Sequence, residues 1–478
     1  MDALELARWQ FGITTVYHFF FVPITIGLSF VVALMQTLWI RTRHEDWLRL
    51  SKFFGKLFTI NFALGLVTGI VQEFQFGMNW SDYSRFVGDI FGAPLAIEAL
   101  LAFFLESTFL GLWLFGWGRI PEALHNAAIW LVHIGTLLSA YFILAANSFM
   151  QNPVGYRNNP ETGRAELVDF WAVLTNPVQL VTFPHVATAA YATGAGLVVA
   201  VAVWHLWRKK FPADEGMYRK GARLGAWIML VASLGVVVTG DVQGKIMTDV
   251  QPMKMAAAEA LYDTEDSCAS FSILTIGTPD GEHEKFAITV PCVLSFLATG
   301  DVDGKVEGIN QLQEEYAKVY GGSGDPLLEV RDYRPNIMVT YWSFRYMMGA
   351  GALGMLAAAA VLWGTRGGRS LTSRWWYPAA LAALFGPLLG NSFGWIFTEM
   401  GRQPWVVFGL MNTEDGVSPG VGVAEVLTSM VVFTLLYGAL AVIEVKLMLR
   451  YASAGAEHAD AGKAQRMTAD DEPHVFAY

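Results

Sequence analysis

The chain has 478 residues, of which 54% are hydrophobic and only 15% are charged, and its mean hydropathy is +0.39. Soluble domains carry about 25% charged residues, so this composition excludes a soluble protein and indicates an integral membrane protein in a lipid bilayer. The formal net charge of −10 gives no support for nucleic-acid binding.

Nine apolar segments are long enough to cross a bilayer, which takes about 20 residues. In chain order they are residues 11–40, 53–76, 93–117, 124–148, 178–207, 223–245, 336–364, 377–400 and 422–446. No internal repeat stands out. The predicted fold is therefore an all-α integral membrane protein with nine transmembrane helices.

The positions of Lys and Arg predict the orientation, because short cytoplasmic loops are enriched in both. Basic residues cluster in the loop 41–52 and in the segments that follow spans five, seven and nine, whereas the alternate connections hold few. We therefore expect the N-terminus outside and the C-terminus in the cytoplasm. The residues between spans six and seven then form one long extracytoplasmic loop.

This topology predicts four regions: spans one to six (1–245), the outer loop (246–335), spans seven to nine (336–450) and a polar tail (451–478). The two cysteines, Cys268 and Cys292, fall in the outer loop, on the side where disulfides persist, so we predict that they pair. Two cysteines cannot hold an iron–sulfur cluster, which needs about four ligands. The tail is rich in Ala, Asp, Glu and His and is predicted to be disordered.

Four residues of types that bind iron lie towards the outer ends of four spans. His18 is in span one, His185 and Met347 are near the starts of spans five and seven, and Glu399 ends span eight. His and Met are the usual axial pair of an electron-transferring haem. A lone His in a span is as often a packing or hydrogen-bonding residue as a ligand, and a Met fills space in the core by default. Arg345 favours the haem interpretation of Met347, because a buried Arg needs an anion such as a propionate.

The remaining histidines have simpler interpretations. His125 and His133, eight residues apart in span four, are interpreted as structural. The others fall in loops, at span ends or in the tail and are interpreted as solvated, namely His44, His205, His283, His458 and His474.

Span three carries two carboxylates, Glu98 and Glu106. On an α-helix, eight residues turn through about 800°, which places these side chains roughly 80° apart around the axis and ~12 Å apart along it. Ionisable residues inside a span are costly and usually functional. Two carboxyl groups spaced inward along one span predict a proton relay.

Glu399 and Arg402 lie where span eight ends, within residues 395–405. A charge at that depth costs roughly 2.5 to 3.5 kcal/mol, and Arg402 is the nearest partner in the sequence. In the outer loop, Lys254 and Glu259 are five residues apart, which is the wrong spacing for a helical ion pair. One hypothesis is that they flank a ligand that accepts and releases protons.

Six motifs are spread along the chain. They are Glu73-Phe-Gln-Phe-Gly-Met-Asn-Trp80, Gly88-Asp-Ile-Phe-Gly-Ala-Pro-Leu-Ala-Ile-Glu98, Phe103-Phe-Leu-Glu-Ser-Thr108, the segment from Gln251 to Glu259, Trp342-Ser-Phe-Arg345 and Gly401-Arg-Gln-Pro-Trp405. Together they resemble subunit I of the cytochrome bd-type quinol oxidases, and the likeness covers all nine spans. The last motif is highly specific.

The resemblance implies a set of haem ligands. His185 and Met347 resemble the axial ligands of a low-spin haem b, with Arg345 beside it. His18 and Glu399 resemble ligands of the two haems of the oxygen-reducing centre, one high-spin haem b and one haem d. Which of these two residues serves which haem is left open.

Further roles follow from the same resemblance. Glu98 resembles the acid next to the oxygen-reducing centre, and Glu106 resembles a member of its proton path. Trp395 resembles the aromatic residue between haems. Lys254 and Glu259 resemble the quinol-site pair of the family's Q loop, which here lacks the extended C-terminal half of longer-looped members.

The implied function is that of a quinol:dioxygen oxidoreductase in the bacterial cytoplasmic (inner) membrane. Quinol is oxidised under the outer loop and releases protons outside, while the protons for water come from the cytoplasm. A proton-motive force is then built without pumping. A second membrane subunit, subunit II, is an expected partner, and small accessory subunits are left open. Arg402 is expected to satisfy a haem propionate or to orient the turn after span eight.

Two alternative functions have less support. A haem–copper oxidase needs about three His for copper besides its haem ligands, and the spans offer too few with suitable spacing. A proton-coupled secondary transporter would use Glu98, Glu106 and Lys56, but the repeat symmetry and broken helices common in transporters are not visible. The sequence leaves open whether ubiquinol or menaquinol is preferred.

Overall fold

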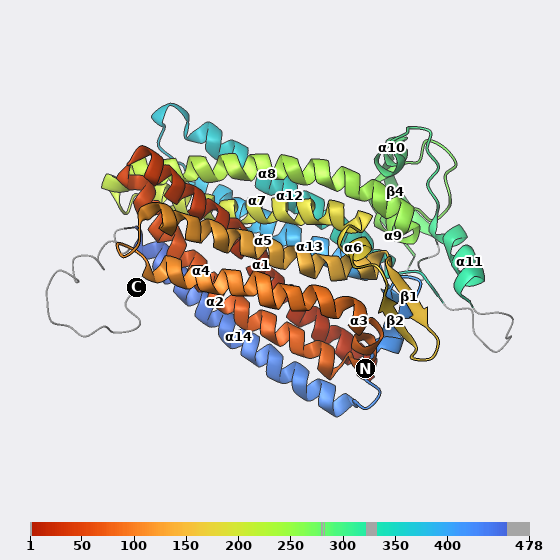
Figure 1. Cartoon of the computed structure of the whole chain (residues 1–478). Helices are drawn as coiled ribbons and strands as arrows, with labels where there is room; N and C mark the ends of the chain where they lie inside the picture. Colours follow the sequence, from red (N-terminus) through yellow and green to blue (C-terminus); the bar gives the residue numbers. More distant parts are fainter. Residues whose placement is uncertain (1, 279–280, 282, 322–331, 457–478) are drawn as a thin grey trace.

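The computed structural model describes residues 2–278, 281, 283–321 and 332–456. Within this part of the chain, nine helices are long and apolar enough to cross a membrane, as predicted. The N-terminus and the end of the last helix lie at opposite ends of the elongated bundle (Figure 1). The described residues between α8 and α12 lie at the same end as the N-terminus, which we name the connection end.

Eight of the nine spans in the described part of the chain are longer than predicted, mostly because they continue past the apolar core, whereas span seven, predicted as 336–364, is one residue shorter. The spans are α1 (Ala3–Thr42), α2 (Glu45–Met78), α3 (Ser81–Ile97) continued by η1 (Glu98–Phe103) and α4 (Phe104–Phe115), α5 (Glu122–Gln151), α6 (Phe170–Leu174) with α7 (Pro177–Arg208), η2 (Pro212–Asp214) with α8 (Glu215–Val250), α12 (Ile337–Gly364), α13 (Trp376–Met400) and α14 (Val423–Ala454).

Polar residues set several of the helix starts. Asp2 caps α1 by accepting the Glu5 backbone N–H at 2.8 Å, and Asn336 caps α12 in the same way. At α7, Asn176 is the cap and Pro177 occupies the first helical position, where its missing N–H costs nothing.

Glycines allow the central helices to approach closely. At the crossing of α1 and α7, a Cβ on Gly27 would lie only 2.6 Å from the backbone N of Gly194. At the crossing of α12 and α13, a Cβ on Gly386 would lie 2.8 Å from the backbone of Gly354. Small residues at such crossings are typical of membrane helix packing, and α1 and α7 are the most buried of the spans.

The third span contains a π-helical segment, η1, between α3 and α4. The prediction for Glu98 and Glu106 assumed an uninterrupted α-helix, and the 80° separation is therefore wrong. A π-helix bonds residue i to i+5 and turns through a smaller angle per residue. The two carboxylates consequently lie closer to one face of the span than predicted.

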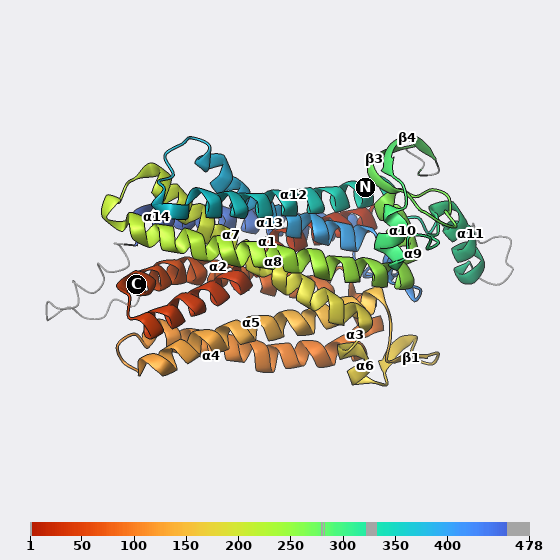
Figure 2. The same cartoon turned by 90° about the horizontal axis from the view of Figure 1, so that it is seen from above.

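The connection between α8 and α12 folds over the end of the bundle (Figure 2). It contains α9 (Pro252–Glu259), β3 (Phe271–Gly277), β4 (Glu284–Val290), α10 (Val293–Thr299) and α11 (Ile309–Tyr320). Strands β3 and β4 pair antiparallel, and a disulfide joins Cys268 to Cys292 on either side of this hairpin, as predicted. Helix α9 is buried beneath these elements and packs against α12.

Shorter elements complete the connection end and the loop after α12. They are β1 (Tyr156–Asn159), β2 (Arg164–Leu167), η3 (Arg366–Gly368), β5 (Trp405–Val407), β6 (Met411–Asn412) and η4 (Thr413–Gly416).

Two predictions outside the site need correction. The tail was expected to begin at residue 451, but α14 continues to Ala454; residues 457–478 lie outside the described part of the chain. His205 is not solvated: it is 3% exposed, stacks on Tyr218 and bonds through Nε2 to the Ala452 carbonyl at 2.8 Å. His458 and His474 lie outside the described residues.

The contacts of the span-four histidines agree with a structural role. His125 bonds through its two ring nitrogens to Gln36 and to the Trp113 carbonyl, each at 2.8 Å. His133 bonds to Ser29 at 3.0 Å and to Tyr191 at 3.1 Å. With both nitrogens engaged, neither ring has a free site for a metal.

Candidate functional site

His18 and His185 are held in the same way on two different helix pairs. His18 Nδ1 lies 2.9 Å from the Thr68 hydroxyl on α2, and His185 Nδ1 lies 3.0 Å from the Thr239 hydroxyl on α8. Each threonine hydroxyl donates its own hydrogen to a backbone carbonyl at 2.8 Å. Each hydroxyl must therefore accept from Nδ1–H, which leaves the lone pair on Nε2. This is the tautomer that an iron-binding histidine needs.

A glycine faces each of three candidate ligands. A Cβ on Gly69 would lie 3.2 Å from His18 Cε1, and one on Gly240 would lie 3.3 Å from His185 Cε1. The third glycine, Gly394 of α13, faces Met347, and a Cβ there would lie 3.1 Å from the sulfur. At each of these three glycines the backbone lies close to the candidate ligand, so a larger residue there would displace the ligand side chain. These residues fit the haem ligation that the resemblance implies.

Trp395 joins α13 to α1. It follows Gly394 in the sequence, and its ring stacks on Phe19 with centroids 4.5 Å apart and planes 12° apart. Phe19 in turn follows His18 in α1. This stacking therefore connects α13 to α1 close in sequence to two candidate ligands.

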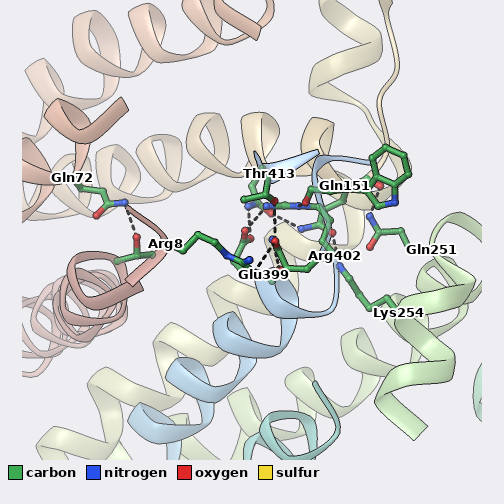
Figure 3. Close-up of polar contacts among 12 residues, drawn as sticks. Arg8, Gln72, Gln151, Gln251, Lys254, Glu399, Arg402 and Thr413 are labelled. Carbon is green, nitrogen blue, oxygen red and sulfur yellow. Dashed lines mark hydrogen bonds and ion pairs between the residues drawn. The ribbon is translucent and has the colours of Figure 1, made fainter. Parts of the chain in front are cut away.

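The Glu399–Arg402 segment forms a sharp helix end, as predicted, and is drawn in Figure 3. Arg402 Nη2 donates to Glu399 Oε2, and Arg402 Nε donates to the Trp405 carbonyl at 3.3 Å. The second Glu399 oxygen accepts from Asn147 Nδ2 at 2.9 Å. Arg402 is 3% exposed, yet its Nη1 has no partner among the described residues. A buried, unpaired guanidinium N–H fits an additional anion such as a haem propionate.

Arg345 already has an anion within the protein. Its Nη2 lies 2.6 Å from Glu259 Oε2, and its guanidinium also donates to the Ser272 carbonyl. Glu259 therefore supplies an anion that a buried Arg needs, and the contact of Arg345 with a propionate stays a prediction. Burial raises the pKa of Glu259, and the Arg345 charge opposes that rise. The pair joins α12 to the end of α9.

Lys254 is buried at the start of α9 and points towards the cluster of Glu399 and Arg402. Its ammonium donates to Gln151 Oε1 at the end of α5. Burial and the charge of Arg402 lower the pKa of Lys254 to about 7, whereas Glu399 opposes the change. Lys254 and Glu259 thus have different partners, and α9 brings one to the Glu399 cluster and the other to Arg345.

Both carboxylates of the third span face α5. Ser139 on α5 donates to Glu98 at 2.7 Å. Glu106 is 8% exposed and packs on Gly135, where a Cβ would lie 2.7 Å from its Cγ. The contact of both carboxylates with α5 agrees with the smaller angle between them that η1 produces.

Four uncharged residues at the site were not identified from the sequence, namely Asn147, Gln151, Thr68 and Thr239. Their side chains bond directly to predicted site residues. A buried polar group without a partner is costly, so Asn and Gln near a span end were the available signal. That signal is weak because uncharged polar residues commonly bond within their own helix.

Comparison with known proteins gives consistent matches over nearly the whole chain. The family profile described as cytochrome bd terminal oxidase subunit I matches residues 6–456. Cytochrome bd ubiquinol oxidase subunit 1 of Bacillus subtilis (strain 168) is 48% identical over 459 residues, which cover 96% of this chain and 95% of that protein. Cytochrome bd-II ubiquinol oxidase subunit 1 of Escherichia coli (strain K12) is 36% identical over 502 residues, covering 95% and 97%.

Among solved structures, the bd oxidase from Geobacillus thermodenitrificans has the same fold. The TM-score is 0.81 at 28% sequence identity, and the alignment covers 94% of this chain and 98% of that chain.

Proposed function

This chain belongs to the family of cytochrome bd terminal oxidase subunit I, and from that premise we propose how its residues divide the work of a quinol oxidase. The protein is a multi-pass membrane oxidoreductase that uses haem, oxidises quinol and works with a second subunit. The match over residues 6–456 carries this conclusion. The transporter hypothesis is not supported, since the sequence relatives and the structural match reported above are oxidases.

His185 and Met347 hold the low-spin haem b, and His18 and Glu399 serve the high-spin haem b and haem d. The Nδ1–threonine bonds support this assignment, because they present Nε2 of each histidine as the donor. Bound haem supplies the one-electron transfers and the dioxygen reduction that side chains cannot perform. Arg402, whose buried Nη1 has no partner among the described residues, would hold a haem propionate, while its Nη2 keeps Glu399 in place.

Two regions of the chain handle protons. Lys254 of the connection takes a proton from quinol, and Glu259 at the other end of α9 orients Arg345. Glu106 and Glu98 pass protons along α5 from the opposite end of the bundle towards the oxygen-reducing centre. Trp395 fills the space between Met347 and His18.

The connection end faces the outside of the bacterial inner membrane. The basic loops at the opposite end support this orientation, as does the Cys268–Cys292 disulfide, since disulfides persist outside the cytoplasm. Oxidation outside and proton uptake from inside then build a proton-motive force without pumping. Subunit II completes the proton path, and small accessory subunits can add to the complex.

The function is tested on the complex purified with its second subunit. We expect a visible spectrum with separate b-type and d-type haem bands, and quinol-dependent consumption of dioxygen that stops when quinol is withheld. A purified complex without haem bands, or one that binds haem but does not oxidise quinol, would contradict the proposal.

Lys254→Met is expected to lower quinol oxidation about 100-fold, the usual contribution of a general base. In the unchanged protein, kcat/KM for quinol should rise with pH up to about 7, because a proton acceptor must first be unprotonated and the pKa of Lys254 is about 7. The variant should lose this inflection. Lys318→Met is the control, since Lys318 is an exposed lysine of the same connection. An inflection near pH 7 that persists in Lys254→Met would exclude Lys254 as the acceptor.

A further inference from the structure

Two amide side chains at the end of α5 connect Lys254 to Glu399. Asn147 and Gln151 lie one helical turn apart, and Gln151 Nε2 donates to Asn147 Oδ1 at 3.5 Å. Gln151 Oε1 accepts from the Lys254 ammonium, as drawn in Figure 3, and Asn147 Nδ2 donates to Glu399 at 2.9 Å. A continuous chain of hydrogen bonds therefore runs from the connection to the helix end that carries Glu399.

The groups at the two ends of this series of hydrogen bonds fix the orientation of both amide side chains. An ammonium group only donates hydrogen bonds, and an ionised carboxylate only accepts them. The Gln151 oxygen must therefore face Lys254, and the Asn147 nitrogen must face Glu399. Both amide dipoles then point the same way, and aligned hydrogen bonds in a buried site strengthen one another.

Gln151 also anchors the start of the connection through its backbone. Its carbonyl accepts from Gln251 Nε2 at 2.6 Å, and residues Gln151, Gln251 and Lys254 are 4%, 3% and 5% exposed. A polar group buried to this degree is costly unless it is hydrogen-bonded. Each of the three residues therefore restricts where the other two can lie.

We propose that Gln151 is a positioning residue that holds the Lys254 amine in a fixed place relative to Glu399, and so couples quinol oxidation to the oxygen-reducing centre. The inference rests on the proposed roles of Lys254 and Glu399. Gln151 acts through Lys254 on one side and through Asn147 on the other. The two contacts are separable, because the amide uses its oxygen for one and its nitrogen for the other.

Two substitutions at this position separate the contacts. Gln151→Leu removes both, so we expect the quinol KM to rise about tenfold with a smaller change in kcat, together with a shift of the absorption band of the haem at Glu399. Gln151→Glu still accepts from Lys254 but cannot donate to Asn147. Its carboxylate also raises the pKa of Lys254, so its KM should stay within about twofold of the unchanged protein only when it is measured about two pH units higher, while the band shift remains. Both are measured on the complete complex, by steady-state kinetics and by the visible spectrum of the resting enzyme.

Gln72→Leu is the matched control. Gln72 is another partly buried amide at the connection end, and it donates to Thr15 at 2.7 Å rather than to Lys254 or Glu399 (Figure 3). It should change neither KM nor the band. The inference is overturned if Gln151→Leu behaves like this control, or if Gln151→Glu raises KM as much as Gln151→Leu does.

Two further variants keep the outcome decisive. If Gln151→Leu does not assemble, Gln151→Glu and Asn147→Leu decide: both should shift the band, and an unshifted band in both overturns the inference. Lys254→Met distinguishes a failure of the role proposed for Lys254 from a failure of the role proposed for Gln151. If it leaves quinol oxidation unchanged, the proposed role of Lys254 fails; if it impairs oxidation while Gln151→Leu does not, only the positioning role of Gln151 fails.

Discussion

Arg345→Met is expected to destabilise the packing of α9 on the bundle by about 3 to 5 kcal/mol, the usual effect of breaking a buried ion pair. The side chains of Arg345 and Glu259 are only 10% and 3% exposed, so removal of the guanidinium leaves a buried carboxylate without its countercharge. The Ser272 carbonyl also loses its donor. The measurement is the thermal unfolding of the complex, followed by protease cleavage within the connection.

The pH dependence of this loss gives an independent check. Burial already raises the pKa of Glu259, and loss of Arg345 removes the effect that opposes the rise. A carboxyl group with a raised pKa in the folded state binds more protons there than in the unfolded state, so its stability contribution falls as pH rises. The destabilisation of Arg345→Met should therefore be smaller at about pH 5 than at about pH 8.

The double variant Arg345→Met/Glu259→Met is the control for charge. Apolar residues of similar size often replace a buried ion pair with little loss, so the double variant should recover much of the stability lost in Arg345→Met. The coupling between the two sites should then be as large as 3 kcal/mol. Additive losses in the double variant would show that the pair does not act as a unit.

The spans and the helix end that carries Glu399 could be predicted from the sequence because their physical signals are strong. About 20 apolar residues suffice to identify a span, and a charge within a span, such as Glu399, is costly enough to be informative. The sharp helix end before Arg402 could be expected from the Gly and Pro around it. Each of these signals is local in the sequence.

Partners that are distant in the sequence could not be predicted in this way. Arg345 pairs with Glu259 across 86 residues, and Lys254 reaches Gln151 across 103, so neither pairing leaves a local pattern. The π-helical segment at Glu98 packs against α5, a contact that the local sequence does not reveal. Burial of His205 likewise depends on α14 continuing past its apolar core to Ala452.

Helix α9 makes buried polar contacts with the bundle near both of its ends. Its first turn carries Lys254, which joins the Glu399 cluster, and its last residue is Glu259, which joins Arg345 beside Met347. The stretch from Lys254 to Glu259 is therefore fixed to the bundle at two places, through Gln151 and through Arg345. Movement of the connection would disturb both contacts at once.

His18→Ala and Glu399→Ala are each expected to lower dioxygen reduction on the order of 100-fold or more, because loss of even an outer-shell partner of a metal ligand costs about 10 to 100-fold. Each variant should lose or shift a different high-spin band in the redox spectrum and keep the low-spin haem b signal, which we assign to His185 and Met347. The band that disappears then assigns haem d or high-spin haem b to that residue.

The matched control for these variants is His133→Ala, which removes a buried span histidine whose two ring nitrogens are already engaged by Ser29 and Tyr191. It should keep all three haem signals, although its stability falls. Thr68→Val should give an intermediate result, since it removes only the hydroxyl that holds His18 Nδ1. The ligand assignment fails if His18→Ala retains every haem band with full activity, or if His133→Ala loses a band as completely as His18→Ala does. Because Nε2 of His18 is presented for ligation by a bond at Nδ1, the order of effects should be His18→Ala first, Thr68→Val second and His133→Ala last.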